Sequence, residues 1–134
     1  MKKSLRKKLD ILWSKKVRER DKWCKRHVGK NYSSRLNAHH IITKSTGDML
    51  RWDVVCGISL CCIPCHKWGE NSAHNNPAAF QKWYRLTFPH NWRYLQKRKK
   101  IIFSFKDWHY PIIKEAIEDL RPLKEVDYLL RGEK

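Results

Sequence analysis

The chain has 134 residues, which suits a single domain with a modest hydrophobic core. Thirty lysines and arginines against 13 acidic residues give a formal net charge of +17, so we expect a polyanionic partner such as nucleic acid. No apolar run approaches the roughly 18 residues of a membrane span, and no apolar stretch typical of a signal peptide follows the basic N-terminus. These features argue against a membrane protein and predict a cytoplasmic one.

Residue types that bind transition metals or transfer protons are concentrated in one stretch, from Ala38 to His74. It contains four of the seven histidines and four of the five cysteines. Because thiols stay reduced in the cytoplasm, this many cysteines favour a bound metal over disulfides. We therefore expect the functional site of the protein in this stretch.

An amphipathic helix is predicted over residues 4–20, where leucine, tryptophan and valine recur every three or four residues opposite a basic face. In the following segment, Cys24 and His27 form a Cys-x-x-His pair that is closed by Gly29. This pattern is typical of a zinc knuckle, since glycine permits the tight turn. The pair alone is weak support, and it gains weight from a second half further along the chain.

A hairpin and a helix are predicted next. Residues 36–42 alternate in character and residues 54–60 form a second apolar, β-branched run, with a polar turn at 43–48. A helical segment is expected to begin near residue 65. Residues 76–77, Asn-Pro, then restart a helix as its N-cap and first helical position.

The C-terminal part of the chain is predicted to be a helical extension over residues 92–121. The preceding helix is expected to break at 87–91. Residues 92–100 form a basic segment on the surface, residues 104–107 resemble a capping box, and Pro122 ends the last helix.

Four residues have the spacing of a structural zinc site. Cys24 and His27 form one half, and Cys62 and Cys65 form a Cys-x-x-Cys half near the end of the hairpin. Four such ligands complete a tetrahedral zinc site, which would join the knuckle to the hairpin. Cys61 is an alternative to Cys62, although its spacing to Cys65 is looser. Without a metal, these cysteines would act as small buried hydrophobic residues.

Four histidines form a second candidate site. His39 and His40 are adjacent on a predicted strand and therefore point to opposite faces, so that one can bind a metal while the other faces a substrate. If the helix after the hairpin is continuous, His66 and His74 return to within about 80° of one another and can both face the hairpin. A metal ion and a nearby histidine suffice for phosphodiester hydrolysis.

Several short motifs resemble one known family. They are His-His-Ile-Ile (39–42), Leu-Arg-Trp-Asp (50–53), Gly-Ile-Ser-Leu-Cys (57–61), Cys-His-Lys-Trp (65–68) and Ala-His-Asn-Asn-Pro (73–77). In this order they resemble the HNH endonucleases, which are ββα-metal or His-Me finger nucleases, and particularly their small zinc-stapled phage members. The resemblance extends from about Leu5 to Leu120, and the central motif is its most specific part.

The resemblance implies an α+β fold built on a ββα-metal hairpin–helix core with a structural zinc knuckle. That core would cover about residues 23–86 of a single HNH-type nuclease domain spanning residues 1–134. The N-terminal basic helix at 4–20 and the C-terminal helical extension at 92–121 would flank it.

Roles in the site follow from the resemblance by position. His40 resembles the general base that activates water, His39 the strand ligand of the catalytic cation, and His74 the helix ligand. His66 resembles a further catalytic ligand or a phosphate contact. The cation would be Mg²⁺, Mn²⁺, Ni²⁺ or Zn²⁺, and the products would carry 5′ phosphate and 3′ hydroxyl groups. The asparagine that braces the base-bearing loop in the family falls near Cys56 here.

The sequence therefore predicts a metal-dependent endonuclease or nickase that acts on double-stranded or branched DNA, in the host cytoplasm if it is phage-encoded. The alternative is a catalytically impaired, zinc-stapled nucleic-acid-binding module. The presence of Cys56 near the position of the bracing asparagine favours this alternative. An RNA-binding or ribosome-associated basic protein would fit the charge but would leave the His-His strand unexplained. Phosphate contacts are expected from basic residues, namely Lys7, Lys15, Lys16, Arg51, Lys97, Arg98, Lys99 and Lys100.

Overall fold

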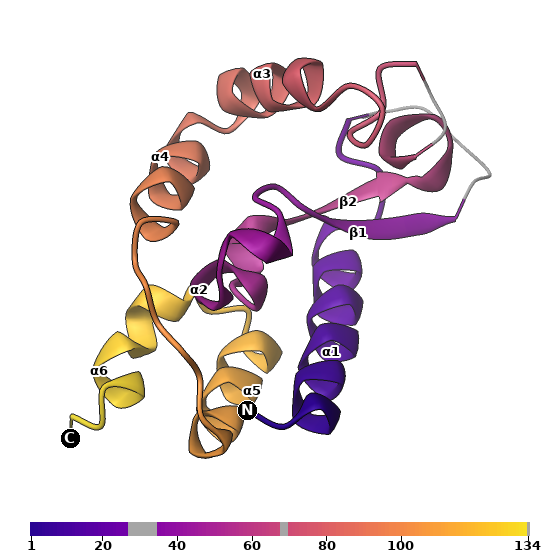
Figure 1. Cartoon of the computed structure of the whole chain (residues 1–134). Helices are drawn as coiled ribbons and strands as arrows, with labels where there is room; N and C mark the ends of the chain where they lie inside the picture. Colours follow the sequence, from indigo (N-terminus) through magenta and orange to yellow (C-terminus); the bar gives the residue numbers. More distant parts are fainter. Residues whose placement is uncertain (27–34, 68–69, 134) are drawn as a thin grey trace.

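The computed structural model describes residues 1–26, 35–67 and 70–133, which form an α+β fold that is mostly helical (Figure 1). Its helices are α1 (Lys3–Asp21), α2 (Asp48–Arg51), α3 (Pro77–Thr87), α4 (Pro89–Arg98), α5 (Tyr110–Glu118) and α6 (Asp127–Leu130). Strands β1 (Leu36–His40) and β2 (Gly57–Cys61) form one antiparallel sheet. None of the helices among the described residues is both long and apolar enough to cross a membrane.

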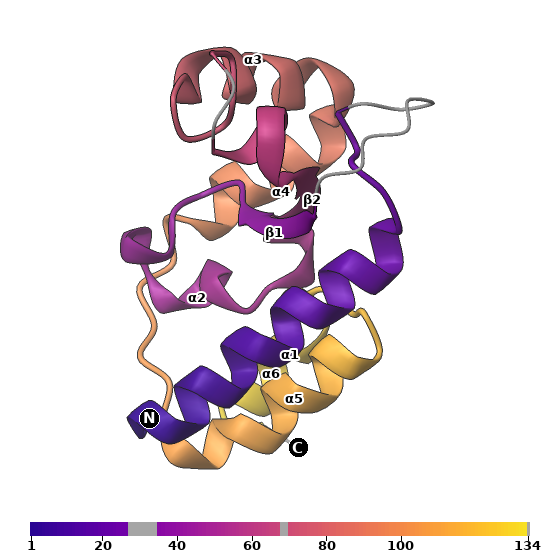
Figure 2. The ribbon, with the colours of Figure 1, turned by 90° about the vertical axis from the view of Figure 1, so that its right-hand side faces the viewer.

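Helix α1 confirms the amphipathic helix predicted at the N-terminus. Leu9, Trp13 and Val17, spaced four residues apart, are buried along one face of the helix. This face contacts both strands and α5, and Figure 2 shows α1 running below the sheet with α5 beside it. In Figures 1 and 2 the strands lie between α1 and α3, so the hairpin occupies the middle of the molecule.

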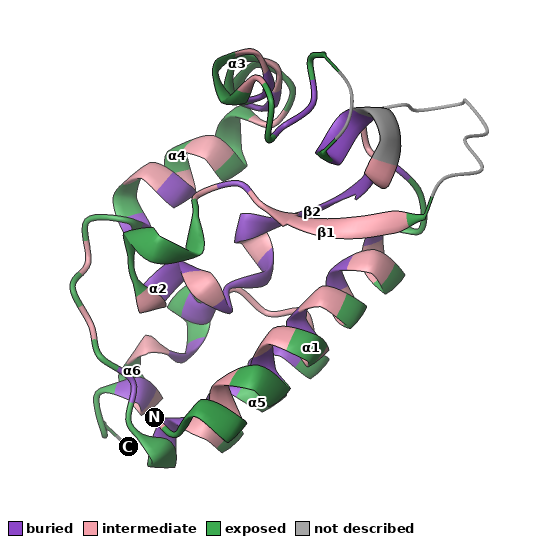
Figure 3. Ribbon diagram, turned by 45° about the vertical axis from the view of Figure 1, so that its right-hand side comes forward, coloured by how far each residue is buried: buried purple, intermediate pink, exposed green. Residues whose placement is uncertain are grey.

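The two strands confirm the predicted hairpin, although the second strand begins later than expected. His39 pairs with Ile58 and His40 with Gly57. Residues 54–56 form a 3-10 turn instead of extended chain, because the Asp53 carboxylate caps that turn by accepting the Val55 N–H at 3.0 Å. All of β2 is buried whereas β1 is half-buried, so β1 carries the side chains that reach the surface (Figure 3).

Buried side chains form two hydrophobic clusters. One joins α1 to α5 and the C-terminal residues, and includes Trp13, Trp52 and Ile117. The other joins β2 to α3 and α4, and includes Leu60 and Phe80. The sheet and its connecting loop contribute side chains to both clusters. The loop after β1 is therefore packed against both of them.

Among the described residues, the helical segment expected from about residue 65 does not form, and this prediction is wrong. Residues 62–66 form one π-helical turn. The chain then returns, so that the Ala73 N–H donates to the Cys65 carbonyl at 2.7 Å and the His74 N–H to the His66 carbonyl at 3.0 Å. Helix α3 begins only at Pro77, with the Asn76 side chain capping it as predicted.

The C-terminal helices differ from the prediction in two places. The break expected at 87–91 is confined to Phe88, because Pro89 opens α4 at once. The capping box expected at 104–107 is not formed, since a 3-10 turn at 107–109 leads into α5. In that turn the buried His109 accepts the Lys106 N–H at Nδ1 and donates from Nε2 to the Leu130 carbonyl, and it thereby ties the C-terminus to α5.

Gly57 permits the close approach of β2 to α1. A Cβ atom at this position would lie 2.6 Å from both Trp13 Cζ2 and Val17 Cγ2. We expect Gly57→Ala to lower the free energy of unfolding by about 1–3 kcal/mol, the usual range for an overpacked core. Urea denaturation followed by circular dichroism measures the change.

The matched control adds Val17→Ala, which removes one of the two crowding groups. This substitution should cost less stability in the Gly57→Ala background than in the wild type, because there it also relieves the clash. Equal costs in the two backgrounds would show that the helix simply moves away from the strand.

Candidate functional site

Three of the predicted site histidines come together at one end of the hairpin. His39 comes from β1, His66 from the end of the π-helical turn, and His74 from the returning chain. Their ring nitrogens lie within 4.8 Å of one another, and Nε2 of His66 is 3.0 Å from Nε2 of His74. The sequence predicted this grouping, but the returning chain and not a continuous helix brings His74 to it.

Donor chemistry in this histidine group fits a divalent cation. Burial lowers the pKa of His39 to about 3, and its histidine neighbours add to the effect. Burial, with His74 and Lys67 nearby, lowers the pKa of His66 to about 4, so both rings are neutral at pH 7. Two nitrogens at 3.0 Å need a proton or a cation between them, and two nitrogen ligands of one tetrahedral zinc-like ion lie about 3.4 Å apart.

Asn37 orients the ring of His66. Its side-chain amide is hydrogen-bonded to His66 Nδ1 at 3.1 Å. The partner atom is the amide nitrogen of Asn37, which donates, so Nδ1 of His66 accepts and the neutral ring carries its proton at Nε2, facing Nε2 of His74. Asn37 lies on the same strand as His39, two residues earlier, and therefore on the same face of the sheet.

His40 points to the other face of β1 and has different partners. Its ring stacks on Trp13 with centroids 3.8 Å apart and an angle of 10° between the planes. Nε2 donates to the Arg51 carbonyl at 2.9 Å, so Nδ1 of the neutral ring keeps its lone pair. Burial lowers the pKa of His40 to about 4 despite this hydrogen bond. The ring is thus neutral, fixed and able to accept a proton at Nδ1.

The residues that hold His40 are themselves held by α1. The Asp10 carboxylate receives two hydrogen bonds from Arg51, at 3.0 and 2.7 Å, and one from Trp52 Nε1 at 2.9 Å. Burial alone would raise the pKa of Asp10, but these hydrogen bonds keep it below its usual range. Asp10 on α1 therefore positions Arg51, whose backbone carbonyl accepts the hydrogen bond from His40.

A cavity of about 340 Å³ is lined both by the three-histidine group and by His40. The residues that line it are Ala38, His39, His40, Thr43, Lys44, His66, Lys67 and His74. No carboxylate is among these lining residues, so an anion can enter it without repulsion.

Cys56 lies where the resemblance expects the bracing asparagine. Its thiol accepts the Ile42 N–H at 3.4 Å and donates to the Ile42 carbonyl at 3.5 Å, while its backbone carbonyl accepts the Ile41 N–H. Burial raises the pKa of Cys56 to about 12, so the group remains a thiol and a donor. It therefore ties the loop after His40 to the start of β2.

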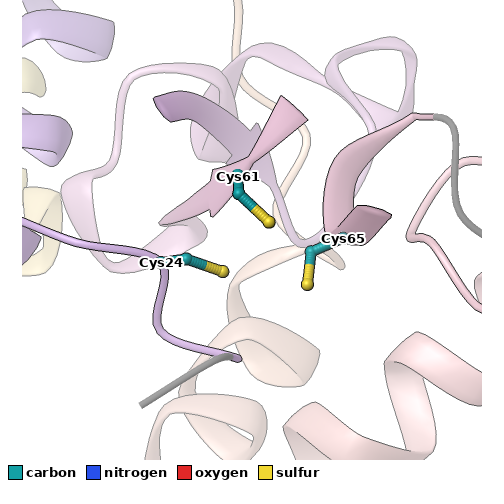
Figure 4. A group of neighbouring side chains, drawn as sticks. All are labelled: Cys24, Cys61 and Cys65. Atoms are coloured by element: carbon teal, nitrogen blue, oxygen red, sulfur yellow. The ribbon is translucent and has the colours of Figure 1, made fainter. Parts of the chain in front are cut away.

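The cysteine group lies beyond the other end of β2. The sulfur atoms of Cys24, Cys61 and Cys65 lie within 4.8 Å of one another and point toward a common space (Figure 4). All three side chains are buried and none forms a disulfide. Cys24 is held there because the next residue, Lys25, donates its N–H to the Ser59 carbonyl of β2. This group can hold a metal such as zinc.

The structure places Cys61, and not the predicted Cys62, in this group. Neighbouring residues at a strand end point to opposite sides, so only one of the two can join Cys24 and Cys65. Cys62 is partly exposed and its N–H donates to the Arg35 carbonyl. The fourth predicted ligand, His27, lies outside the described residues.

Thiol chemistry in the group also favours a metal. Burial raises the pKa of Cys61, and the contact with Cys24 together with burial raises that of Cys65. Three neighbouring thiolates would repel one another, and a cation among them removes both penalties.

Four of the eight basic residues predicted to contact phosphate have acidic partners within the protein. Arg98 is only 4% exposed and forms a two-point pair with Asp127, so it joins α4 to α6 and cannot reach a ligand at the surface. Arg51 is engaged with Asp10. Lys15 and Lys16 both pair with Glu19 on α1. The remaining predicted lysines are exposed and form no ion pair with a described residue, namely Lys7, Lys97, Lys99 and Lys100.

The sequence did not identify the four basic residues that line the histidine cavity or the cavity next to it. They are Arg18, Arg35, Lys44 and Lys67. They are scattered over 50 positions of a chain with 30 basic residues, so no local pattern distinguished them.

Comparison with known proteins gives no match: no family model, no curated protein and no solved structure shows significant similarity to this chain. The functional assignment therefore depends on the geometry of the site.

The cysteine group predicts which thiol binds zinc. We expect native mass spectrometry to find one zinc per chain in the wild type and in Cys62→Ser, and to find it lost or readily chelated in Cys61→Ser. The two substitutions are matched because they remove adjacent thiols. Zinc that survives in Cys61→Ser and is lost in Cys62→Ser would contradict the arrangement.

Proposed function

We propose that this protein is a metal-dependent DNA endonuclease or nickase of the HNH type, which hydrolyses phosphodiester bonds. The observation that carries the proposal is the meeting of a three-histidine group and the separately held His40 at one basic cavity. In this proposal β1, β2 and the chain leading into α3 form the ββα-metal core.

His39, His66 and His74 would hold the divalent cation, Mg²⁺, Mn²⁺, Ni²⁺ or Zn²⁺. When bound, the cation stabilises negative charge on the phosphate and on the leaving oxygen. Asn37 holds the ring of His66 in place through its hydrogen bond to Nδ1, while Lys44 and Lys67 attract the phosphate backbone.

His40 would act as the general base. Nδ1 takes a proton from water, the water oxygen forms a bond to phosphorus, and the bond from phosphorus to the 3′ oxygen breaks. The products carry a 5′ phosphate and a 3′ hydroxyl. Trp13 on one ring face and the Arg51 carbonyl at Nε2 restrict rotation of the imidazole, so the lone pair at Nδ1 keeps one direction.

Cys24, Cys61 and Cys65 would hold a structural zinc, with His27 as the proposed fourth ligand. This ion would join the chain after α1 to the end of β2 and to the π-helical turn that carries His66. Structural zinc contributes much of the folding energy of small domains, so chelation should disorder the histidine group as well.

The direct test is cleavage of supercoiled plasmid and of branched DNA by protein that keeps its structural zinc, is freed of other divalent cations by dialysis, and is then supplied with Mg²⁺, Mn²⁺ or Ni²⁺. We expect nicked or linear products only when a divalent cation is added. DNA binding without cleavage under every cation would instead identify a zinc-stapled nucleic-acid-binding module, and absence of both would reject nucleic acid as the partner.

Substitutions at the two adjacent histidines should differ in kind. His40→Ala should reduce the cleavage rate by roughly 10²- to 10⁴-fold at every metal concentration, the usual worth of a positioned base. His39→Ala should weaken metal binding, so that a higher metal concentration partly restores cleavage. A metal titration of the cleavage rate of both variants tests this difference. If added metal alone restored cleavage by His40→Ala, then His40 would be the metal ligand and His39 the base.

Asp10 should act on catalysis through Arg51. Asp10→Asn weakens the ion pair that positions Arg51, whose carbonyl accepts the hydrogen bond from His40. We expect kcat to fall by about tenfold to a hundredfold with KM unchanged. Asp48→Asn is the matched control, because Asp48 forms an equally close pair with Arg6 between α1 and α2. Equal losses of kcat in both variants would mean that Asp10 has only a structural role.

A further inference from the structure

A second cavity, of about 250 Å³, adjoins the histidine cavity on the side of α1. Its polar and charged lining residues come from α1, from the start of β1 and from the end of the π-helical turn, namely Ser14, Arg18, Arg35, Asn37, His66 and Lys67. Three of them are cationic and none is acidic.

The charges of this cavity are not neutralised within the part of the chain that the structure describes. Arg18, Arg35 and Lys67 form no ion pair with any described residue. By contrast, Lys15 and Lys16, which lie on α1 with Arg18, both pair with Glu19. Arg18 Nε donates to the Ser14 carbonyl at 3.2 Å, which fixes the guanidinium and leaves its terminal N–H groups for a ligand. A planar guanidinium with such donors matches the geometry of a phosphate.

The two cavities are contiguous, because Ala38, His66 and Lys67 line both. A nucleic acid strand carries one phosphate for each nucleotide, so a phosphate at the histidine group has a neighbour close by on either side. The second cavity offers a cluster of unneutralised cations for such a neighbour.

We propose that this second cavity binds the backbone phosphate next to the one that is cleaved, and that Arg18, Arg35 and Lys67 thereby select the bond presented to His40. The proposal rests on the proposed nuclease function for the identity of the cleaved bond. Binding of a phosphodiester in the cavity does not require cleavage.

The first arm of the test measures binding alone, with zinc-containing protein to which no further divalent cation is added. The affinity for duplex DNA is measured over a range of salt for wild type, Arg18→Gln, Arg35→Gln and Lys8→Gln, where Lys8 is an exposed residue of α1 that lines neither cavity. Loss of one phosphate contact lowers the slope of log affinity against log salt by about 1. We expect that loss in Arg18→Gln and Arg35→Gln, and a wild-type slope in Lys8→Gln.

The second arm measures cleavage of oligonucleotides that carry one neutral methylphosphonate. For each bond cut by the wild type, we expect neutralisation of one adjacent phosphate to reduce cutting by about tenfold, and to have little further effect in Arg18→Gln. Equal effects in both proteins, with wild-type salt slopes in the arginine variants, would overturn the proposal. Absence of cleavage in the wild type would reject the nuclease function, and the first arm would still decide whether the cavity binds phosphate.

Discussion

The two hydrogen bonds that return the chain after the π-helical turn support both candidate sites. Ala73 donates to Cys65 and His74 to His66, so one short turn is fixed at two adjacent carbonyls. Cys65 belongs to the cysteine group, and the next residue, His66, belongs to the histidine group. A metal at the cysteines would therefore stabilise the backbone that positions the histidines. The peptide unit between Cys65 and His66 would couple the two candidate sites.

The opposite face of β1 depends on α1. Trp13 stacks on His40 and donates from Nε1 to the Asp53 carbonyl, and Asp10 holds Arg51. These contacts require α1 to lie directly on the hairpin, which the absence of a side chain at Gly57 permits. Because alternation along β1 separates His39 from His40, the proposed cation ligand and the proposed base are held by different parts of the chain. Each can then be adjusted without disturbing the other.

Features set by local periodicity or spacing were predictable from the sequence. The apolar stripe of α1 and the opposite directions of His39 and His40 follow from helical and strand geometry. The path from His66 to His74 was not predictable, because a helical count assumes a continuous helix and the chain instead turns back on itself. Cys62 was preferred over Cys61 by spacing alone, whereas the direction of the side chain at the end of β2 decides between them. The role of Arg98 depends on Asp127, a long-range partner that no local pattern reveals.

The central proposal is that the chain has two separate metal sites, a cysteine site that would hold the fold and a histidine site that would perform the chemistry. Anomalous diffraction from crystals of the zinc-containing protein soaked in Mn²⁺, recorded at both absorption edges, tests it most directly. The account predicts a zinc peak about 2.3 Å from the sulfur atoms of Cys24, Cys61 and Cys65, and a separate manganese peak among His39, His66 and His74. Absence of manganese from the histidines, or of zinc from the three sulfur atoms, would contradict it.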